Sequence, residues 1–131
     1  MTKVLLVDDN PSIRETIEFL LSDEGFDVTT AENGQEALDT LKTSPQDVII
    51  MDIMMPVMDG IDFLQHQGRD PLMNHIPVIV ATASMDDHRK VKCYPQVADT
   101  LKKPFMIADL KKAIESALDT KHKSKVACAV A

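Results

Sequence analysis

The chain has 131 residues, of which 44% are hydrophobic and 27% are charged, and its formal net charge is −7. This length fits one domain with one core, and no apolar run approaches the about 18 residues that suggest a membrane span. The acidic balance argues against direct binding to nucleic acid, which depends on Lys and Arg contacts with phosphates. We therefore expect protein partners, with neither nucleic acid nor membrane among them.

Residues 4–7 form a continuous apolar run that ends at Asp8 and Asp9. An apolar run without polar alternation predicts a strand that is covered on both faces. The same run is too short for the hydrophobic region of a secretory signal. We expect a central strand here and a cytoplasmic protein.

A helix, a second strand and another helix follow. Asn10 and Pro11 are typical helix-start residues, and apolar residues recur at helical spacing until Gly25. The predicted inner face of this helix consists of Ile13, Ile17, Leu20 and Leu21. Residues 26–31 predict a short strand, and Asn33 predicts the cap of a second helix. The inner face of that helix contains Ala37, Leu38 and Leu41.

Three further strands are predicted, and each is followed by a helix. Residues 47–52 predict a strand that ends at Asp52, and residues 78–81 predict one that leads to Thr82. The helix after Thr82 should end before Pro95, because the residue before a proline disfavours helix. The fifth strand is short and ends at Lys103. The inner faces of the third and last helices contain Ile61 and Leu64, and Ile107, Leu110, Ile114 and Leu118.

Alternating strands and helices predict an α/β domain with a parallel sheet and helices on both faces. We place this domain at residues 3–119 and expect residues 120–131 to form a disordered C-terminal tail. Ligands of such folds bind outside the carboxyl ends of the strands. The polar residues expected at these ends are Asp8, Asp9, Asp52, Thr82 and Lys103. We expect them to form one site.

The three carboxylates at these strand ends need a cation. Two like charges about 4 Å apart repel by roughly 4 kcal/mol at an effective dielectric of 20. Lys103 is the candidate that the sequence offers at another strand end.

Four sequence blocks resemble the receiver domain of bacterial response regulators. The blocks are LVDDN at residues 6–10, MDIMMPVMDG at 51–60, VATA at 80–83 and KPF at 103–105. The resemblance covers residues 3–119 and implies a flavodoxin-like three-layer sandwich with a five-stranded parallel sheet in the order 2-1-3-4-5. It implies a response regulator of a two-component system or phosphorelay. We expect it to stand alone, because no output domain follows Asp119 in this sequence.

The resemblance implies a phosphoryl chemistry for the site. Asp52 would accept a phosphoryl group from a phosphohistidine donor. Thr82, Ala83 and Lys103 would bind this group, and the hydroxyl of Thr82 would pull the following loop inward. The protein would thus be no enzyme, although it would assist its own phosphorylation and slow dephosphorylation.

The same resemblance implies that Mg²⁺ is the cofactor. The ion would bind Asp9, Asp52 and the backbone carbonyl of Met54, while Asp8 would act mainly through water. Mg²⁺ suits such a site because it takes oxygen ligands and keeps several waters. The charges of the three carboxylates, the ion and Lys103 would sum to zero, so the site could admit an anion.

The resemblance also implies the partners. A sensor histidine kinase or a histidine phosphotransfer protein would donate the phosphoryl group. A downstream protein would bind the face formed by the fourth helix, the fifth strand and the fifth helix. The peptide bond between Lys103 and Pro104 would be cis.

One position departs from the family pattern. Many receivers carry an aromatic residue three positions before the lysine, where this chain has Thr100, and residues 93–96 are unusual for the region of the fourth helix. We expect the chemistry at Asp52 to persist and the fourth-helix face to move without the rotation of an aromatic side chain.

Two other functions compete with this interpretation. A receiver-like interaction module without phosphorylation is favoured by Thr100, although the intact acidic residues argue against it. An aspartyl-phosphate hydrolase of the haloacid dehalogenase type also uses an aspartate nucleophile with Mg²⁺. Its motif is DxD after the first strand, whereas this chain has Asp8, Asp9 and Asn10 there.

Overall fold

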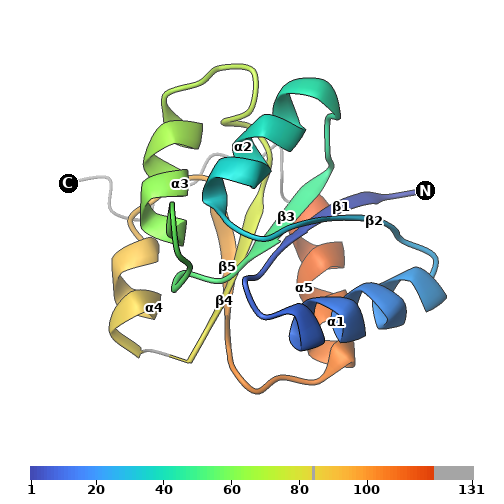
Figure 1. The fold of residues 1–131 in the computed structure, drawn as a ribbon. Coiled ribbons are helices and arrows are strands. Elements are labelled where there is room, and N and C mark those ends of the chain that lie inside the picture. The colour runs from blue at the N-terminus through green and yellow to red at the C-terminus, as the bar shows by residue number, and fades with distance from the viewer. Residues whose placement is uncertain (84, 120–131) are drawn as a thin grey trace.

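The computed structural model describes residues 1–83 and 85–119, and the predicted tail at 120–131 lies outside the described residues. The described chain forms a five-stranded parallel sheet in the order β2-β1-β3-β4-β5 (Figure 1). The strands are β1 (Lys3–Val7), β2 (Asp27–Ala31), β3 (Val48–Met51), β4 (Val78–Thr82) and β5 (Val97–Lys102). The helices are α1 (Pro11–Asp23), α2 (Gly34–Thr43), α3 (Gly60–Gly68), α4 (Met85–Val91) and α5 (Ile107–Asp119). The predicted fold class and strand order are confirmed.

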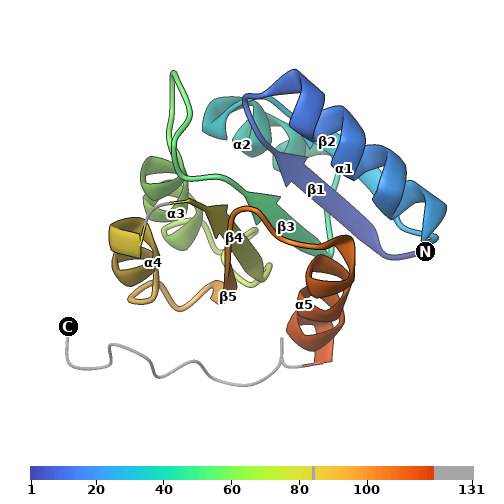
Figure 2. The same cartoon turned by 90° about the horizontal axis from the view of Figure 1, so that it is seen from below.

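Helices cover both faces of the sheet and give the three layers expected of this fold. α1 and α5 pack on one face through buried residues that include Leu21 and Ile114. α2, α3 and α4 cover the other face, where Leu38, Phe63 and Val91 lie in the core. Figure 2 shows α5 and α4 on opposite sides of the β4–β5 edge.

The three central strands explain the continuous apolar runs of the sequence. Residues 4–7 of β1 and all residues of β3 and β4 are buried. The edge strands β2 and β5 are only partly buried. A strand between two others and under two layers of helices has no solvent-facing side, so both sets of alternating side chains are apolar.

The inner face predicted for α1 is only partly right. Ile17 and Leu21 are buried, but Ile13 and Leu20 are each 37% exposed. These two side chains line a groove between α1 and the connection from β5 to α5, where they face Phe105. Helical spacing alone could not distinguish the core from this groove, because both lie on the same side of the helix.

Other local predictions are confirmed. α4 ends at Val91, before Pro95, and the peptide bond between Lys103 and Pro104 is cis. Leu64 and Leu110 are buried on the inner faces of their helices. None of the described helices combines the length and apolar character that crossing a membrane would require.

Candidate functional site

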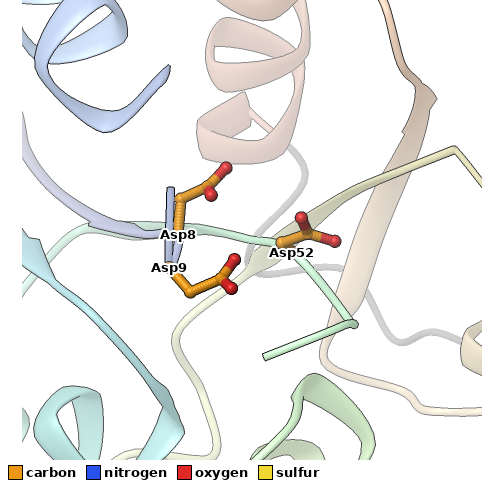
Figure 3. Close-up of side chains that lie close together, drawn as sticks. All are labelled: Asp8, Asp9 and Asp52. Carbon is orange, nitrogen blue, oxygen red and sulfur yellow. The ribbon is translucent and has the colours of Figure 1, made fainter. Parts of the chain in front are cut away.

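The pairing of β1 with β3 brings three carboxylates together. Val7 lies opposite Met51 in the sheet, so Asp8 and Asp52 follow at adjacent strand ends. The N–H of Asp52 also donates to the carbonyl of Val7 at 3.1 Å. One carboxylate oxygen from each of Asp8, Asp9 and Asp52 lies within 4.8 Å of the others. Figure 3 shows these three side chains close together. We call this group of three residues the acidic pocket.

Lys103 is the cation that the acidic pocket requires. Its main-chain N–H donates to the carbonyl of Thr82 at 3.0 Å, which fixes its position beside the end of β4. Its Nζ donates to Oδ2 of Asp52 at 2.8 Å and to Oδ2 of Asp8 at 3.0 Å. Burial lowers the pKa of Lys103, but the hydrogen bonds to Asp52 and Asp8 outweigh this effect and raise the pKa overall. The ammonium group is therefore charged near neutral pH.

Asp52 is held by its own loop as well as by Lys103. Its Oδ1 accepts hydrogen bonds from the N–H groups of Ile53 at 2.7 Å and Met54 at 3.3 Å. The N–H group of Met54 is thus bonded to the carboxylate of Asp52, and the metal-binding role of the Met54 carbonyl stays a prediction. The Asp52 side chain is only 14% exposed.

The loop from Asp52 to α3 contains a tight turn with an unusual backbone. Val57 has a φ of 67°, and the N–H of Met58 donates to the carbonyl of Pro56 at 2.7 Å. A β-branched residue at positive φ is strained, and such strain persists only where neighbouring structure enforces it.

Two glycines enforce this loop conformation. The N–H of Gly34, at the start of α2, donates to the carbonyl of Met58 at 2.9 Å, and a Cβ on Gly34 would lie 2.8 Å from that oxygen. Gly60 donates to the carbonyl of Ile53, and its Cβ would lie 2.8 Å from the carbonyl oxygen of Asp52. The sequence predicts a turn at Gly60 and assigns no role to Gly34. The sequence feature that could have indicated the close contact at Gly34 is a glycine directly after the helix-capping Asn33.

The other predicted residues differ in their distance from the pocket. Thr82 is buried at the end of β4, and the exposed Ala83 follows it. Thr100 lies opposite Val80 within β5, two residues before the strand ends, and its N–H donates to Oδ1 of Asp99. The structure therefore brings Asp8, Asp9, Asp52 and Lys103 into one cluster, with Thr82 joined to it through its carbonyl.

The donor atoms of the acidic pocket fit Mg²⁺. All are oxygens, which this hard ion prefers, and two ligands on opposite sides of one ion lie at most about 4.2 Å apart. A spacing within 4.8 Å therefore needs only a small approach, or one bridging water. Both carboxylate oxygens of Asp8 already accept hydrogen bonds, from Asn10 and Lys103, which fits an indirect role through water.

The comparison with known families agrees with this geometry. A family model described as "Response regulator receiver domain" matches residues 4–115. The chain belongs to the response regulator receiver family. Such receivers are phosphoacceptor signalling modules of two-component systems, and they bind Mg²⁺ in an acidic site.

Several curated relatives are similar over most of this receiver. The DNA-binding transcriptional regulator NtrC of Klebsiella pneumoniae is 42% identical over 115 residues, which cover 86% of this chain and 24% of NtrC. The sensor histidine kinase TmoS of Ectopseudomonas mendocina is 37% identical over 121 residues, which cover 91% of this chain and 12% of TmoS. This receiver thus spans about a quarter of the length of NtrC.

Solved receivers have the same fold. The chemotaxis protein CheY4 of Vibrio cholerae matches with a TM-score of 0.80 and 35% identity, covering 88% of this chain and 97% of CheY4. The receiver domain of the sensor histidine kinase PA1611 of Pseudomonas aeruginosa matches with a TM-score of 0.83 and 28% identity, covering 90% and 98% of the two chains. That structure has a magnesium ion coordinated in the active site cleft.

Proposed function

We propose that this receiver accepts a phosphoryl group on Asp52 from a phosphohistidine donor, in a reaction that depends on Mg²⁺. The observation that carries the proposal is the position of Asp52, whose carboxylate lies beside those of Asp8 and Asp9 and shares the ammonium group of Lys103 with Asp8. A carboxylate at this point is in contact with one cation and belongs to a group of oxygens that can bind another. Phosphoryl transfer depends on such positioning and charge neutralisation more than on protein acid–base chemistry.

The residues have distinct tasks in the proposed reaction. An oxygen of Asp52 attacks the phosphorus atom, the bond from phosphorus to the donor histidine nitrogen breaks, and that nitrogen keeps the bonding electrons. Asp9, Asp52 and the carbonyl of Met54 would hold Mg²⁺, which would supply positive charge to neutralise the phosphoryl oxygens. Lys103 adds a second positive charge, since its Nζ already reaches the Asp52 carboxylate at 2.8 Å.

The end of β4 is the proposed switch. Phosphorylated Asp52 would draw Lys103 and the hydroxyl of Thr82 toward the phosphoryl oxygens. The main-chain N–H of Lys103 donates to the carbonyl of Thr82, so we propose that the main chains of these two residues move together. Ala83 follows directly and offers its backbone to the phosphoryl group. The loop into α4 would then change conformation, as in other switches that a local charge change controls.

The surroundings of the pocket favour a protein as phosphoryl donor. An apolar groove of about 610 Å³ lies between α1 and the β5–α5 connection, and Ala83 and Lys103 line the end that adjoins the acidic pocket. An apolar helix seated in this groove could present a phosphohistidine to Asp52. A sensor histidine kinase or a histidine phosphotransfer protein fits this role. A downstream partner would bind α4, β5 and α5, and we propose a cytoplasmic location for the exchange.

The proposal is tested by intact-mass measurement after incubation with acetyl phosphate and Mg²⁺. We expect one added phosphoryl group on the unmodified protein and on Asp62→Asn, whose side chain is an exposed carboxylate on α3. We expect none on Asp52→Asn and none without a divalent metal. Folded protein that gains no phosphoryl group under any condition would refute phosphorylation and support an interaction module instead. Continuous release of phosphate from small monoesters would support a hydrolase.

A further inference from the structure

The largely buried guanidinium group of Arg14 contacts the main chain of the acidic pocket. The side chain of Arg14, on α1, is 14% exposed. Its Nη1 donates to the main-chain carbonyl of Asp8 at 2.7 Å, and its Nη2 lies 3.7 Å from Oε1 of Glu32. Arg14 thus joins α1 to the ends of both β1 and β2. The planar fork of arginine suits this double contact better than the single ammonium group of lysine.

These contacts close a ring around Asp9. Oδ1 of Asp8 accepts a hydrogen bond from the N–H of Asn10 at 2.9 Å, and the carbonyl of Asn10 accepts one from the N–H of Arg14 at 2.9 Å. The guanidinium of Arg14 then returns to the carbonyl of Asp8. Asp9 is exposed and lies between Asp8 and Asn10, two members of this ring. Within residues 1–83 and 85–119 its carboxylate makes no hydrogen bond or ion pair, so its position depends on the main chain of this turn.

We propose that Arg14 is a positioning residue that orients the turn bearing Asp8 and Asp9 for cation binding. The inference rests on the proposed function, because it concerns the metal site that the proposed function requires. Groups that orient metal ligands are often needed for tight binding, and their loss typically costs 10- to 100-fold in affinity.

Positioning and charge predict opposite results when Arg14 is removed. Arg14 is positive, and a positive charge near the pocket repels a divalent cation. If Arg14 acted through its charge alone, its loss would tighten metal binding. If it acts by holding the turn, its loss weakens metal binding despite the removed repulsion. The direction of the change therefore decides between the two roles.

The test is a titration with Mn²⁺, which accepts the same oxygen ligands as Mg²⁺ and whose free fraction is measured by electron paramagnetic resonance. We expect Arg14→Met to bind Mn²⁺ about tenfold more weakly than the unmodified chain. Arg14→Lys, which retains the charge and one donor, should lose less affinity. Glu32→Gln is the matched control, because it removes the exposed ion-pair partner and leaves the bond from Arg14 to Asp8; we expect less than a twofold change.

Phosphorylation by acetyl phosphate gives a second readout. Arg14→Met should need about tenfold more Mg²⁺ for half-maximal rate, and its rate at saturating Mg²⁺ should stay within threefold of the unmodified chain. A purely structural defect would lower the saturating rate as well. Mn²⁺ binding by Arg14→Met as tight as that of the unmodified chain, or tighter, would overturn the inference. If the unmodified chain bound Mn²⁺ no better than Asp9→Asn, the metal site of the proposed function would be refuted, and the role of Arg14 with it.

Discussion

The acidic pocket and the β5 edge of the sheet are built in different ways. At the pocket, charged side chains from separate strand ends contact one another directly, with Lys103 bonded to both Asp8 and Asp52. Near the β5 edge, neutral amide side chains donate to main-chain carbonyls of α3 and of the segment before β4. The sequence blocks that resemble the family supply the residues of the first region, and Thr100, the position predicted to differ from many receivers, lies in the second.

Glutamine side chains organise the departing region. The side-chain Nε2 of Gln96 donates to the carbonyl of Leu64 at 2.7 Å, while its main-chain carbonyl accepts a hydrogen bond from the N–H of Val78 at 2.8 Å. Gln67 is fully buried and donates to the carbonyls of Met73 at 2.9 Å and Ile76 at 3.0 Å. These amides tie α3 to the segments that enter β4 and β5.

The comparison indicates that the residues for phosphorylation and the residues that would transmit the signal lie in different parts of the receiver. The register of β5 against β4 shifts between Val78 and Ile79, and Thr100 stands where the family resemblance predicts an aromatic residue. Within the described part of the chain, no hydrogen bond or ion pair joins Gln67, Gln96 or Thr100 to the carboxylates of the acidic pocket. We infer that the pocket can be phosphorylated without an aromatic switch, and that the β5 edge responds through its backbone and its amide contacts.

Removal of the pocket cation should have the largest effect. We expect Lys103→Met to lower the rate of phosphorylation by acetyl phosphate on the order of 100-fold, because one charge that stabilises the transferring group is lost. The same change should increase the affinity for Mg²⁺, since Nζ no longer competes for Asp8 and Asp52. Phosphorylation rates and a metal titration measure the two effects.

The neighbouring Lys102 provides the control, because it is exposed. Lys102→Met should change the phosphorylation rate less than twofold. A Lys103→Met variant that is phosphorylated as fast as the unmodified chain would contradict the role of this cation.

Substitution of Gly34 tests the loop that carries Asp52. A Cβ at Gly34 would lie 2.8 Å from both the carbonyl oxygen and Cγ of Met58, so Gly34→Ala forces the loop away from α2. We expect the free energy of unfolding to fall by about 1–3 kcal/mol in urea denaturation. In Gly68→Ala the new Cβ would face only the flexible amide of Gln96 at 3.3 Å, so we expect a change within about 1 kcal/mol. Equal losses in both variants would show that the contact with Met58 has no special importance.

Loss of the Gln96 amide should have the smallest effect and should leave the chemistry intact. Gln96→Ala removes the side-chain donor to the carbonyl of Leu64, which still lies within α3. We expect a loss of about 1 kcal/mol in unfolding free energy, the typical net contribution of one hydrogen bond. Gln65→Ala, which removes only a 3.4 Å contact to Tyr94, should cost less than about 0.5 kcal/mol. A large fall in phosphorylation rate in Gln96→Ala would contradict the separation of the two regions.

The sequence predicts the residues of the acidic pocket better than the contacts that hold those residues in place. Asp8, Asp52 and Lys103 each follow a strand, and parallel strands place their carboxyl ends at one edge, so their proximity follows from the order of elements. The supports need tertiary geometry. The close approach of Gly34 to Met58 and the bond from Arg14 to Asp8 join helices to loops, and no periodic pattern encodes such contacts.

The same limit applies to the groove and the β5 edge. Ile13 and Leu20 have the spacing of core residues, but the structure leaves them beside Phe105 on a groove. The sequence predicts that Gln96 lies in a loop, yet its side-chain amide is nearly buried against α3. Burial of a polar side chain depends on a partner elsewhere in the chain, and that partner is known only once the helices are placed.

Amide hydrogen exchange tests the central claim most directly. The unmodified protein would be compared with and without beryllofluoride, a mimic of the phosphoryl group, in the presence of Mg²⁺, with Asp52→Asn as the control. We predict that exchange changes at the end of β4 and along β5, around Thr82 and Thr100, in the unmodified protein alone. Clear protection at Asp52 and in the loop after it would show that beryllofluoride has bound. If exchange throughout residues 83–101 were then unchanged, the result would contradict the claim that this receiver, with Thr100, transmits the signal from its pocket to the β5 edge.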